Sequence, residues 1–222
     1  MIRLLLLLSI LFFYQPLFSQ DPNRFSPELM RIDSLDRIIK KEESSIEIEN
    51  LFVGSSSIRF WLTLQQDYPD KEILNRGFGG SHMSDLLYHV DKLILQYHPK
   101  KIFIYEGDND ISASESVDDI MAETKELIGL INKELPTTEI YLIAAKPSIA
   151  RWSFVNEYIK LNRAFIKLSL LDPQIHYVDV WTPMLGDDGV VLQDIFIADD
   201  LHMTDKGYDI WAEAIRPFLY EE

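Results

Sequence analysis

Four short segments of the chain contain residues that could carry out nucleophilic catalysis. They are Gly54-Ser55-Ser56-Ser57, Asn75-Arg76-Gly77-Phe78-Gly79-Gly80, Gly107-Asp108-Asn109-Asp110 and Asp199-Asp200-Leu201-His202. A serine hydroxyl attacks an ester when an imidazole takes its proton and a carboxylate holds the other ring nitrogen. A spacing of three lets Asp199 fold back onto His202 in a turn, whereas Asp200 is less well placed. His82, His89, His98 and His176 have no comparable partner pattern.

The same segments also supply donors for an oxyanion. A backbone N–H at Ser56, another at Gly80 and the uncharged side-chain amide of Asn109 could all face the developing charge. Each segment has an ordinary interpretation as well: serines cap helices or cradle phosphate, glycine-rich turns are common, and Asn109 fits an Asx-turn. The chain contains no G-x-S-x-G elbow, so the α/β-hydrolase pattern is not supported.

The elements that must position these residues alternate along the chain. Short apolar runs typical of strands covered on both faces occupy 48–53, 73–75, 101–105, 139–144 and 175–180. Helical apolar stripes occupy 86–97, 117–131 and 155–166. A last helix is predicted with Thr204 as N-cap and with Tyr208, Trp211, Ile215 and Leu219 buried. The alternation predicts a mostly parallel five-stranded sheet between two layers of helices, with ligands bound beyond the carboxyl ends of the strands.

The N-terminal part of the chain differs from the rest. Arg3 precedes an apolar run at 4–13, and Ser19 offers a small residue at a cut position, so residues 1–19 are interpreted as a signal peptide. A membrane anchor is the alternative, but the run is shorter than the roughly 20 residues of a spanning helix. Residues 20–45 are interpreted as a polar N-terminal arm with one surface helix that carries Leu35, Ile38 and Ile39. This arm is expected to pack on the domain without carrying chemistry.

Composition restricts the partners of the protein. The net charge of −15 argues against nucleic acid and against attraction to an anionic lipid surface. The chain has no cysteine, which excludes a disulfide framework and a lipid-modified cysteine. Export would therefore depend on a packed core, and the protein is expected in a periplasm or outside the cell.

Taken together, the four segments resemble the signature blocks of the SGNH (GDSL-like) serine hydrolase family. The resemblance rests on Gly54-Ser55-Ser56, Gly80, Gly107-Asp108-Asn109-Asp110 and Asp199-x-x-His202, in this order, and identifies residues 46–222 as an SGNH hydrolase domain. It implies a flavodoxin-like three-layer α/β/α fold and a serine-esterase mechanism without metal or organic cofactor. It also implies that Ser56 is the nucleophile, His202 the base and Asp199 its orienting acid, with Ser56, Gly80 and Asn109 as oxyanion donors.

One residue departs from the family pattern. The first block usually reads Gly-Asp-Ser, and Ser55 stands where aspartate is usual. That position is not the nucleophile in the family, so we expect a variant rather than a loss of activity.

The expected substrate is a small ester, with acetyl groups on carbohydrate as the leading case. Arg151 and Trp152 follow the fourth strand and could bind it, Trp152 by stacking on a sugar ring and Arg151 through a polar group. For Trp152, plain packing is an equal alternative. A lysophospholipase- or thioesterase-type acyl hydrolase and a non-catalytic glycan-binding module of the same fold are two further hypotheses. A metal-dependent hydrolase, with ligands among Asp108, Asp110, Asp199, Asp200 and His202, is the third.

Overall fold

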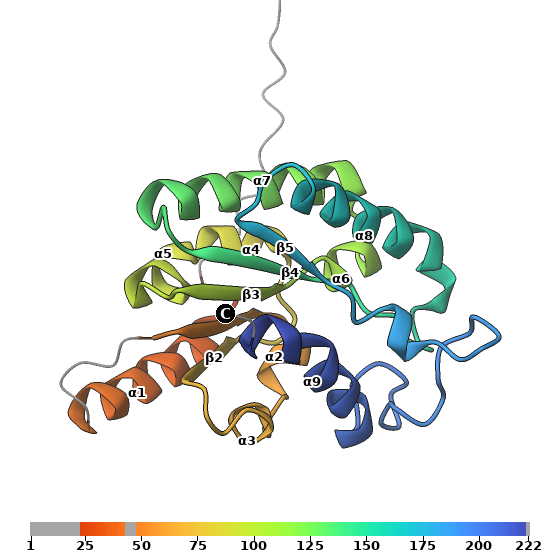
Figure 1. Cartoon of the computed structure of the whole chain (residues 1–222), viewed down its shortest axis with the longest axis horizontal. Coiled ribbons are helices and arrows are strands. Elements are labelled where there is room, and N and C mark those ends of the chain that lie inside the picture. Colours follow the sequence, from red (N-terminus) through yellow and green to blue (C-terminus); the bar gives the residue numbers. More distant parts are fainter. Residues whose placement is uncertain (1–22, 43–47, 221–222) are drawn as a thin grey trace, which may run out of the picture.

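The computed structural model describes residues 23–42 and 48–220 as a sheet between helices (Figure 1). The signal peptide predicted at 1–19 lies outside the described residues. Within the described part of the chain, no helix is long and apolar enough to cross a membrane.

Five parallel strands form the sheet. They are β1 (Asn50–Gly54), β2 (Ile73–Gly77), β3 (Lys101–Tyr105), β4 (Glu139–Ile143) and β5 (Ile175–Val178), in the spatial order β2-β1-β3-β4-β5. The predicted strands and the predicted fold class are thereby confirmed. Strand β2 pairs with one side of β1, and β3, the next strand along the chain, pairs with the other side. The direction of winding therefore reverses at β1, and sheets of this kind bind ligands at such a point.

Alternate side chains of each strand enter two separate cores. On one face the strands pack against helices α4 (Met83–Tyr88), α5 (Val90–Leu93), α7 (Val117–Glu134) and α8 (Val155–Ser169). On the other face they pack against α2 (Ser56–Arg59), α3 (Leu64–Asp67) and α9 (Asp205–Tyr220). On this second face, residues in register on neighbouring strands stack their rings, with centroids 4.4 Å apart for Phe52 and Phe103 and 4.5 Å for Phe103 and Tyr141.

The helix predicted at 86–97 is interrupted. The structure has α4, then α5, then the 3-10 turn η1 (Leu95–Tyr97), with backbone angles outside the helical region at His89 and Ile94. The predicted stripe nevertheless faces the core: Leu86, Val90, Leu93 and Ile94 are buried, and Leu87 and Tyr97 are half-buried. Packing on the sheet therefore outweighs helix propensity in this segment.

Helix α1 (Ser26–Glu42) is the helix of the N-terminal arm, and it lies beside the edge strand β2 (Figure 1). The buried face differs from the predicted one. Ile32 is fully buried, whereas Leu35 is 37% and Ile38 is 52% exposed; the side chain of Ile39 lies outside the described residues. The helix is held mainly by polar groups, which a search for an apolar stripe does not detect.

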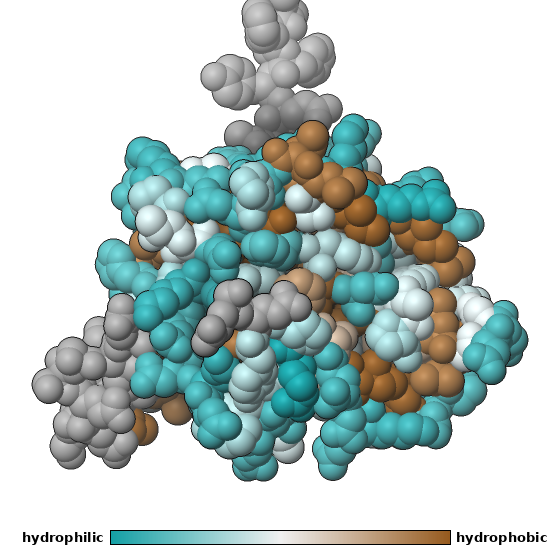
Figure 2. All heavy atoms as spheres, in the orientation of Figure 1, coloured by the Kyte–Doolittle hydropathy of each residue, from teal (hydrophilic) through white to brown (hydrophobic). Residues whose placement is uncertain are grey.

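The last helix begins where it was predicted. Thr204 precedes α9, and its carbonyl accepts from the backbone N–H groups of Gly207 and Tyr208. Its hydroxyl is buried without a hydrogen-bond partner, so the predicted side-chain cap is not formed. The expected core residues Tyr208, Trp211, Ile215 and Leu219 are buried. The face shown in Figure 2 is mostly hydrophilic with smaller apolar patches.

Candidate active site

The end of β1 requires a glycine. Gly54 has a φ of +126°, and a Cβ built on it would lie 2.1 Å from the carbonyl oxygen of Tyr105. This close approach lets the backbone N–H of Ser55 donate to the same oxygen at 3.1 Å. The next residue, Ser56, then opens the single turn of α2 at the carboxyl edge of the sheet.

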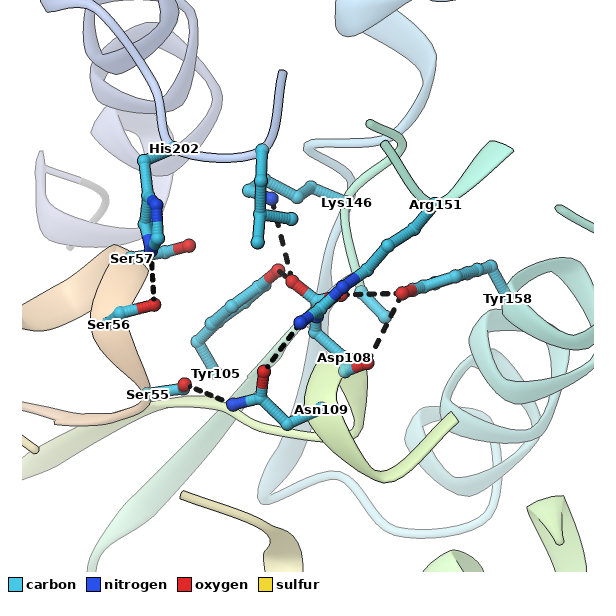
Figure 3. Close-up of polar contacts among 12 residues, drawn as sticks. Ser55, Ser56, Ser57, Tyr105, Asp108, Asn109, Lys146, Arg151, Tyr158 and His202 are labelled. Carbon is cyan, nitrogen blue, oxygen red and sulfur yellow. Dashed lines mark hydrogen bonds and ion pairs between the residues drawn. The ribbon is translucent and has the colours of Figure 1, made fainter. Parts of the chain in front are cut away.

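The structure brings the predicted nucleophile, base and acid into one hydrogen-bonded row. Figure 3 shows the contact between Ser56 and His202. The Oγ of Ser56 lies 2.9 Å from Nε2 of His202, and Nδ1 of His202 lies 2.6 Å from Oδ2 of Asp199. With the imidazole proton on Nδ1, His202 donates to Asp199 and accepts from the serine hydroxyl. This is the arrangement that a serine nucleophile needs in order to lose its proton.

Asp199 is held in its ionised form, in which it can accept a hydrogen bond from the histidine ring. Its Oδ1 accepts from the backbone N–H groups of Leu201 and His202. Burial opposes ionisation, but the hydrogen bond from the His202 ring and these backbone groups outweigh it and lower the pKa of Asp199 to about 2. Asp199 is therefore a carboxylate at any pH at which the protein would work.

Two further segments reach the same edge of the sheet. Gly80 has a φ of +79°, and there is open space where its side chain would be. Asn109 lies in the first turn of α6 (Asp108–Ser112), directly after β3. Its Nδ2 donates to Oγ of Ser55 at 2.6 Å and to the carbonyl of Ser81 at 2.8 Å. Asn109 thus contacts the neighbour of each of the other two expected oxyanion donors, Ser56 and Gly80.

Arg151 and Trp152 have different surroundings. Arg151 donates through Nη1 to Oδ1 of Asp108 at 2.6 Å and through Nη2 to Oδ1 of Asn109 at 3.0 Å. Trp152 stacks against Trp181, with ring centroids 6.4 Å apart and planes 15° apart. Neither contact tests the predicted role in substrate binding, which stays a prediction.

Several residues of the site were not predicted. Ser55 accepts from Asn109, and Tyr105, Tyr158 and Lys146 surround Asp108 (Figure 3). Lys146 could have been noticed, because a charged residue follows the apolar end of a buried strand directly. Tyr158 could not, because it lies on the apolar stripe of its helix and only its hydroxyl takes part.

The ligand set of the metal-dependent hypothesis is not assembled. Among the described residues, the group of three whose ligand atoms lie within 4.8 Å of one another consists of His82, Asp110 and Glu115. Asp110 is its one member from the predicted set. His82 also has a carboxylate partner that the sequence pattern did not reveal, since Nδ1 lies 2.6 Å from Oε1 of Glu115, 33 residues away.

Comparison with known proteins agrees with this geometry. The GDSL-like Lipase/Acylhydrolase family model matches residues 54–210, and no protein with a curated function matches the chain in sequence. Similar folds occur in a Streptococcus pneumonia protein named for platelet activating factor (24% identity, TM-score 0.76, covering 89% of this chain and 95% of that one) and in a Bacteroides thetaiotaomicron GDSL-like lipase (18%, 0.69, 88% and 97%). A catalytic mutant of a Geobacillus stearothermophilus acetylxylan esterase is also similar (16%, 0.63, 80% and 98%).

These likenesses agree with the fold, and the family match covers all four signature segments from Gly54 to His202. The predicted resemblance is confirmed, and the chain belongs to the GDSL-like lipase/acylhydrolase family of carboxylic ester hydrolases.

Proposed function

We propose that the protein is an exported serine esterase that removes acetyl or other small acyl groups from carbohydrate. The observation that carries the proposal is the hydrogen-bonded row from Ser56 through His202 to Asp199. Variants of the similar acetylxylan esterase in which a serine, an aspartate or a histidine is replaced are described as catalytic mutants, and their aspartate and histidine are also three positions apart.

In the first half of the reaction, Oγ of Ser56 attacks the ester carbonyl carbon while its proton passes to Nε2 of His202. Asp199, already ionised, stabilises the imidazolium that results. The carbonyl oxygen becomes an oxyanion, to which the backbone N–H groups of Ser56 and Gly80 donate. The amide of Asn109 also donates to it, through the N–H group that leaves the hydroxyl of Ser55. The tetrahedral intermediate then collapses, and the departing alcohol oxygen takes the proton from His202.

Water completes the cycle by the same steps in reverse order. His202 takes a proton from water, the hydroxide attacks the acyl carbon, and the bond to Oγ of Ser56 breaks as the proton returns to the serine. The acid is released and the resting enzyme is restored. No step requires a group other than these residues and water.

A longer acyl chain is the second candidate substrate, and one observation favours it. The ring of Phe60 lies 5.2 Å from the ring of His202 and is 42% exposed, and Ile197, whose backbone N–H donates to the carbonyl of His202, is 48% exposed. An apolar surface beside the base would contact an apolar acyl or alcohol group. This observation supports the alternative hypothesis of a lysophospholipase- or thioesterase-type acyl hydrolase.

The test is turnover of aryl esters by the protein starting at Gln20. We expect the wild type to hydrolyse an aryl acetate and Ser56→Ala to lose about 10⁴-fold or more in kcat, as happens when a nucleophile of this kind is removed. Ser153→Ala, which changes an exposed serine of the 3-10 turn η2 (Trp152–Phe154) before α8, serves as the matched control. Equal rates for wild type and Ser56→Ala would overturn the assignment of Ser56.

The same protein decides between the two substrate classes. Acetylated xylo-oligosaccharides should be turned over with a higher kcat/KM than aryl esters of eight or more carbons. The reverse ranking would favour the long-chain alternative. Export is tested separately: protein recovered from an exporting host should begin at Gln20, and an intact N-terminus would contradict cleavage after Ser19.

A further inference from the structure

Both polar atoms of the Asn109 side-chain amide have hydrogen-bond partners in the protein. Its Nδ2 donates to Ser55 and to the carbonyl of Ser81, and its Oδ1 accepts from Nη2 of Arg151. A guanidinium has only donors, and a backbone carbonyl has only acceptors. Only one of the two orientations of the amide group satisfies both partners, and it is the one that turns Nδ2 toward Ser55 and Ser81.

This orientation matters for the reaction. If the amide were turned over, Oδ1 would lie where Nδ2 lies now, and a partial negative charge would face the oxyanion instead of a donor. An asparagine side chain rotates freely between the two orientations unless its partners distinguish them. Arg151, which donates to Oδ1, therefore favours the catalytically useful state together with the carbonyl of Ser81, which accepts from Nδ2.

Arg151 is itself fixed by a buried carboxylate. Asp108 accepts from Arg151, from the hydroxyl of Tyr158 at 2.5 Å and from that of Tyr105 at 2.8 Å, and it lies 3.5 Å from Nζ of Lys146. Burial opposes ionisation of Asp108, but the charges of Lys146 and Arg151 outweigh it and hold its pKa well below the usual range. The guanidinium is thus anchored by a permanent negative charge.

The exposure of Arg151 argues against a role mainly in contacting substrate. Its side chain is only 16% exposed, and both Nη atoms already donate within the protein. We propose that Arg151, anchored by Asp108, is a positioning residue that fixes the side-chain amide of Asn109 as an oxyanion donor. The proposal rests on the proposed function, and it differs from the predicted contact between Arg151 and a polar group of the substrate.

Kinetics separate the two roles. We expect Arg151→Met to lower kcat by about 10²-fold, the order seen when an oxyanion donor is lost. The factor should be the same for an aryl acetate and for an acetylated sugar, with KM within about threefold of the wild type. A rise in KM for the sugar alone, with unchanged turnover of the aryl acetate, would mean that Arg151 contacts substrate and would overturn the proposal.

A double-mutant cycle shows whether Arg151 acts through Asn109. In an Asn109→Ala background, Arg151→Met should lower kcat by less than about threefold, because the amide that it positions is already gone. A full second loss of about 10²-fold in that background would overturn the proposal. Arg163→Met, which removes an exposed arginine of α8, is the matched control and should leave kcat unchanged in both backgrounds.

A spectroscopic measurement is independent of activity. The side-chain amide signal of Asn109, assigned by its absence in Asn109→Ala, should exchange slowly with water in the wild type and rapidly in Arg151→Met. An unchanged signal in Arg151→Met would overturn the proposal. If Ser56→Ala were as active as the wild type, the proposed function would fail, and this measurement would still decide how Asn109 is held.

Arg151→Lys is a second variant that tests the proposal even if Arg151→Met does not fold. Lysine keeps the positive charge beside Asp108 but lacks the fork that reaches two acceptors at once. We expect it to fold with a melting temperature near that of the wild type and to show an intermediate kcat and an intermediate amide exchange rate. Wild-type values for both would contradict the proposed role of the guanidinium.

Discussion

Asp199 and Asp200 are adjacent in the sequence but have different tasks in the turn before α9. Asp199 accepts from the ring of His202, whereas Asp200 has a φ of +58° and its carbonyl accepts from the backbone N–H of Ala150. Aspartate and asparagine tolerate this left-handed conformation better than most residues. Asp200 therefore shapes the turn through its backbone, which gives a physical reason for a residue whose role the sequence left open.

This difference predicts opposite results for two matched variants. Asp199→Asn should lower kcat by about 10³- to 10⁴-fold, because the amide can hold the wrong tautomer of the imidazole. Asp200→Asn should keep most of the activity, because asparagine adopts the same backbone conformation. Rates of aryl acetate hydrolysis check both. Equal losses in the two variants would mean that the acid has been assigned to the wrong residue.

The sequence could predict some residues of the site and not others. Asp199 and His202 are three positions apart, so their contact can be recognised locally. Arg151 lies 42 residues from Asn109 and 43 from Asp108, and only the packing of the loop after β4 on the loop after β3 brings them together. Its contacts could not be predicted, although its place beside the site was.

Helix α1 is attached to the edge of the sheet by charged and polar groups. Arg31 donates to the carbonyl of Gly77 at 2.8 Å, and Arg24, in the turn before the helix, donates to the carbonyl of Gly80 at 3.0 Å. Asp36 pairs with Arg76 of β2, whose side chain is 3% exposed, and also accepts from the hydroxyl of Tyr97. The N-terminal arm thus packs on the edge strand, and its Arg24 also contacts the loop that carries Gly80.

Two aspartates of α1 form a matched pair for testing this attachment. Asp36→Ala should lower the free energy of unfolding by about 3–5 kcal/mol, because it leaves the buried charge of Arg76 without its partner. Asp33→Ala breaks an ion pair with Lys92 that is 33–40% exposed, and should cost about 1 kcal/mol or less. Urea unfolding measures both. Equal costs would mean that α1 does not depend on the buried pair.

The elements that could be predicted are those whose pattern is apolar and regular. All five strands and helices α7, α8 and α9 have continuous stripes that face one core or the other. The interruption at His89 and the buried face of α1 could not be predicted, because they depend on tertiary packing and on partners such as Arg76 in another element.

Across the molecule, burial and, after it, neighbouring acidic groups raise the pKa of several carboxyl groups. Burial, followed by the charges of Glu115 and Asp110, raises the pKa of Glu123 to about 7. Burial also raises the pKa of Asp110 and, together with the charge of Asp110, that of Glu106. A glutamate in an unfolded chain titrates near pH 4.3. Between roughly pH 4.3 and 7 Glu123 thus binds more protons in the folded protein than in the unfolded chain, and its contribution to the free energy of unfolding falls as the pH rises.

The contribution of Glu123 can be isolated by substitution. Glu123→Gln should be more stable than the wild type at pH 8 and nearly equal to it at pH 4.5, because glutamine resembles the protonated acid. Glu126→Gln, on the exposed side of the same helix, is the control and should show a difference from wild type that varies less with pH. Urea midpoints at several pH values give the comparison. A pH-independent effect of Glu123→Gln would contradict the raised pKa.

Ser56 and His202 are far apart in the sequence, and this has a consequence for when activity can begin. Ser56, the proposed nucleophile, follows the first strand of the sheet, whereas His202, the proposed base, is 146 residues later in the loop before α9. That loop is held by α9, whose Tyr208 hydroxyl donates to the carbonyl of Ser57 at 3.0 Å. A chain still being synthesised or translocated, or one clipped before the last loop, has Ser56 but lacks His202. If Ser56 and His202 act as proposed, hydrolytic activity begins only when the last loop and α9 have docked on the sheet.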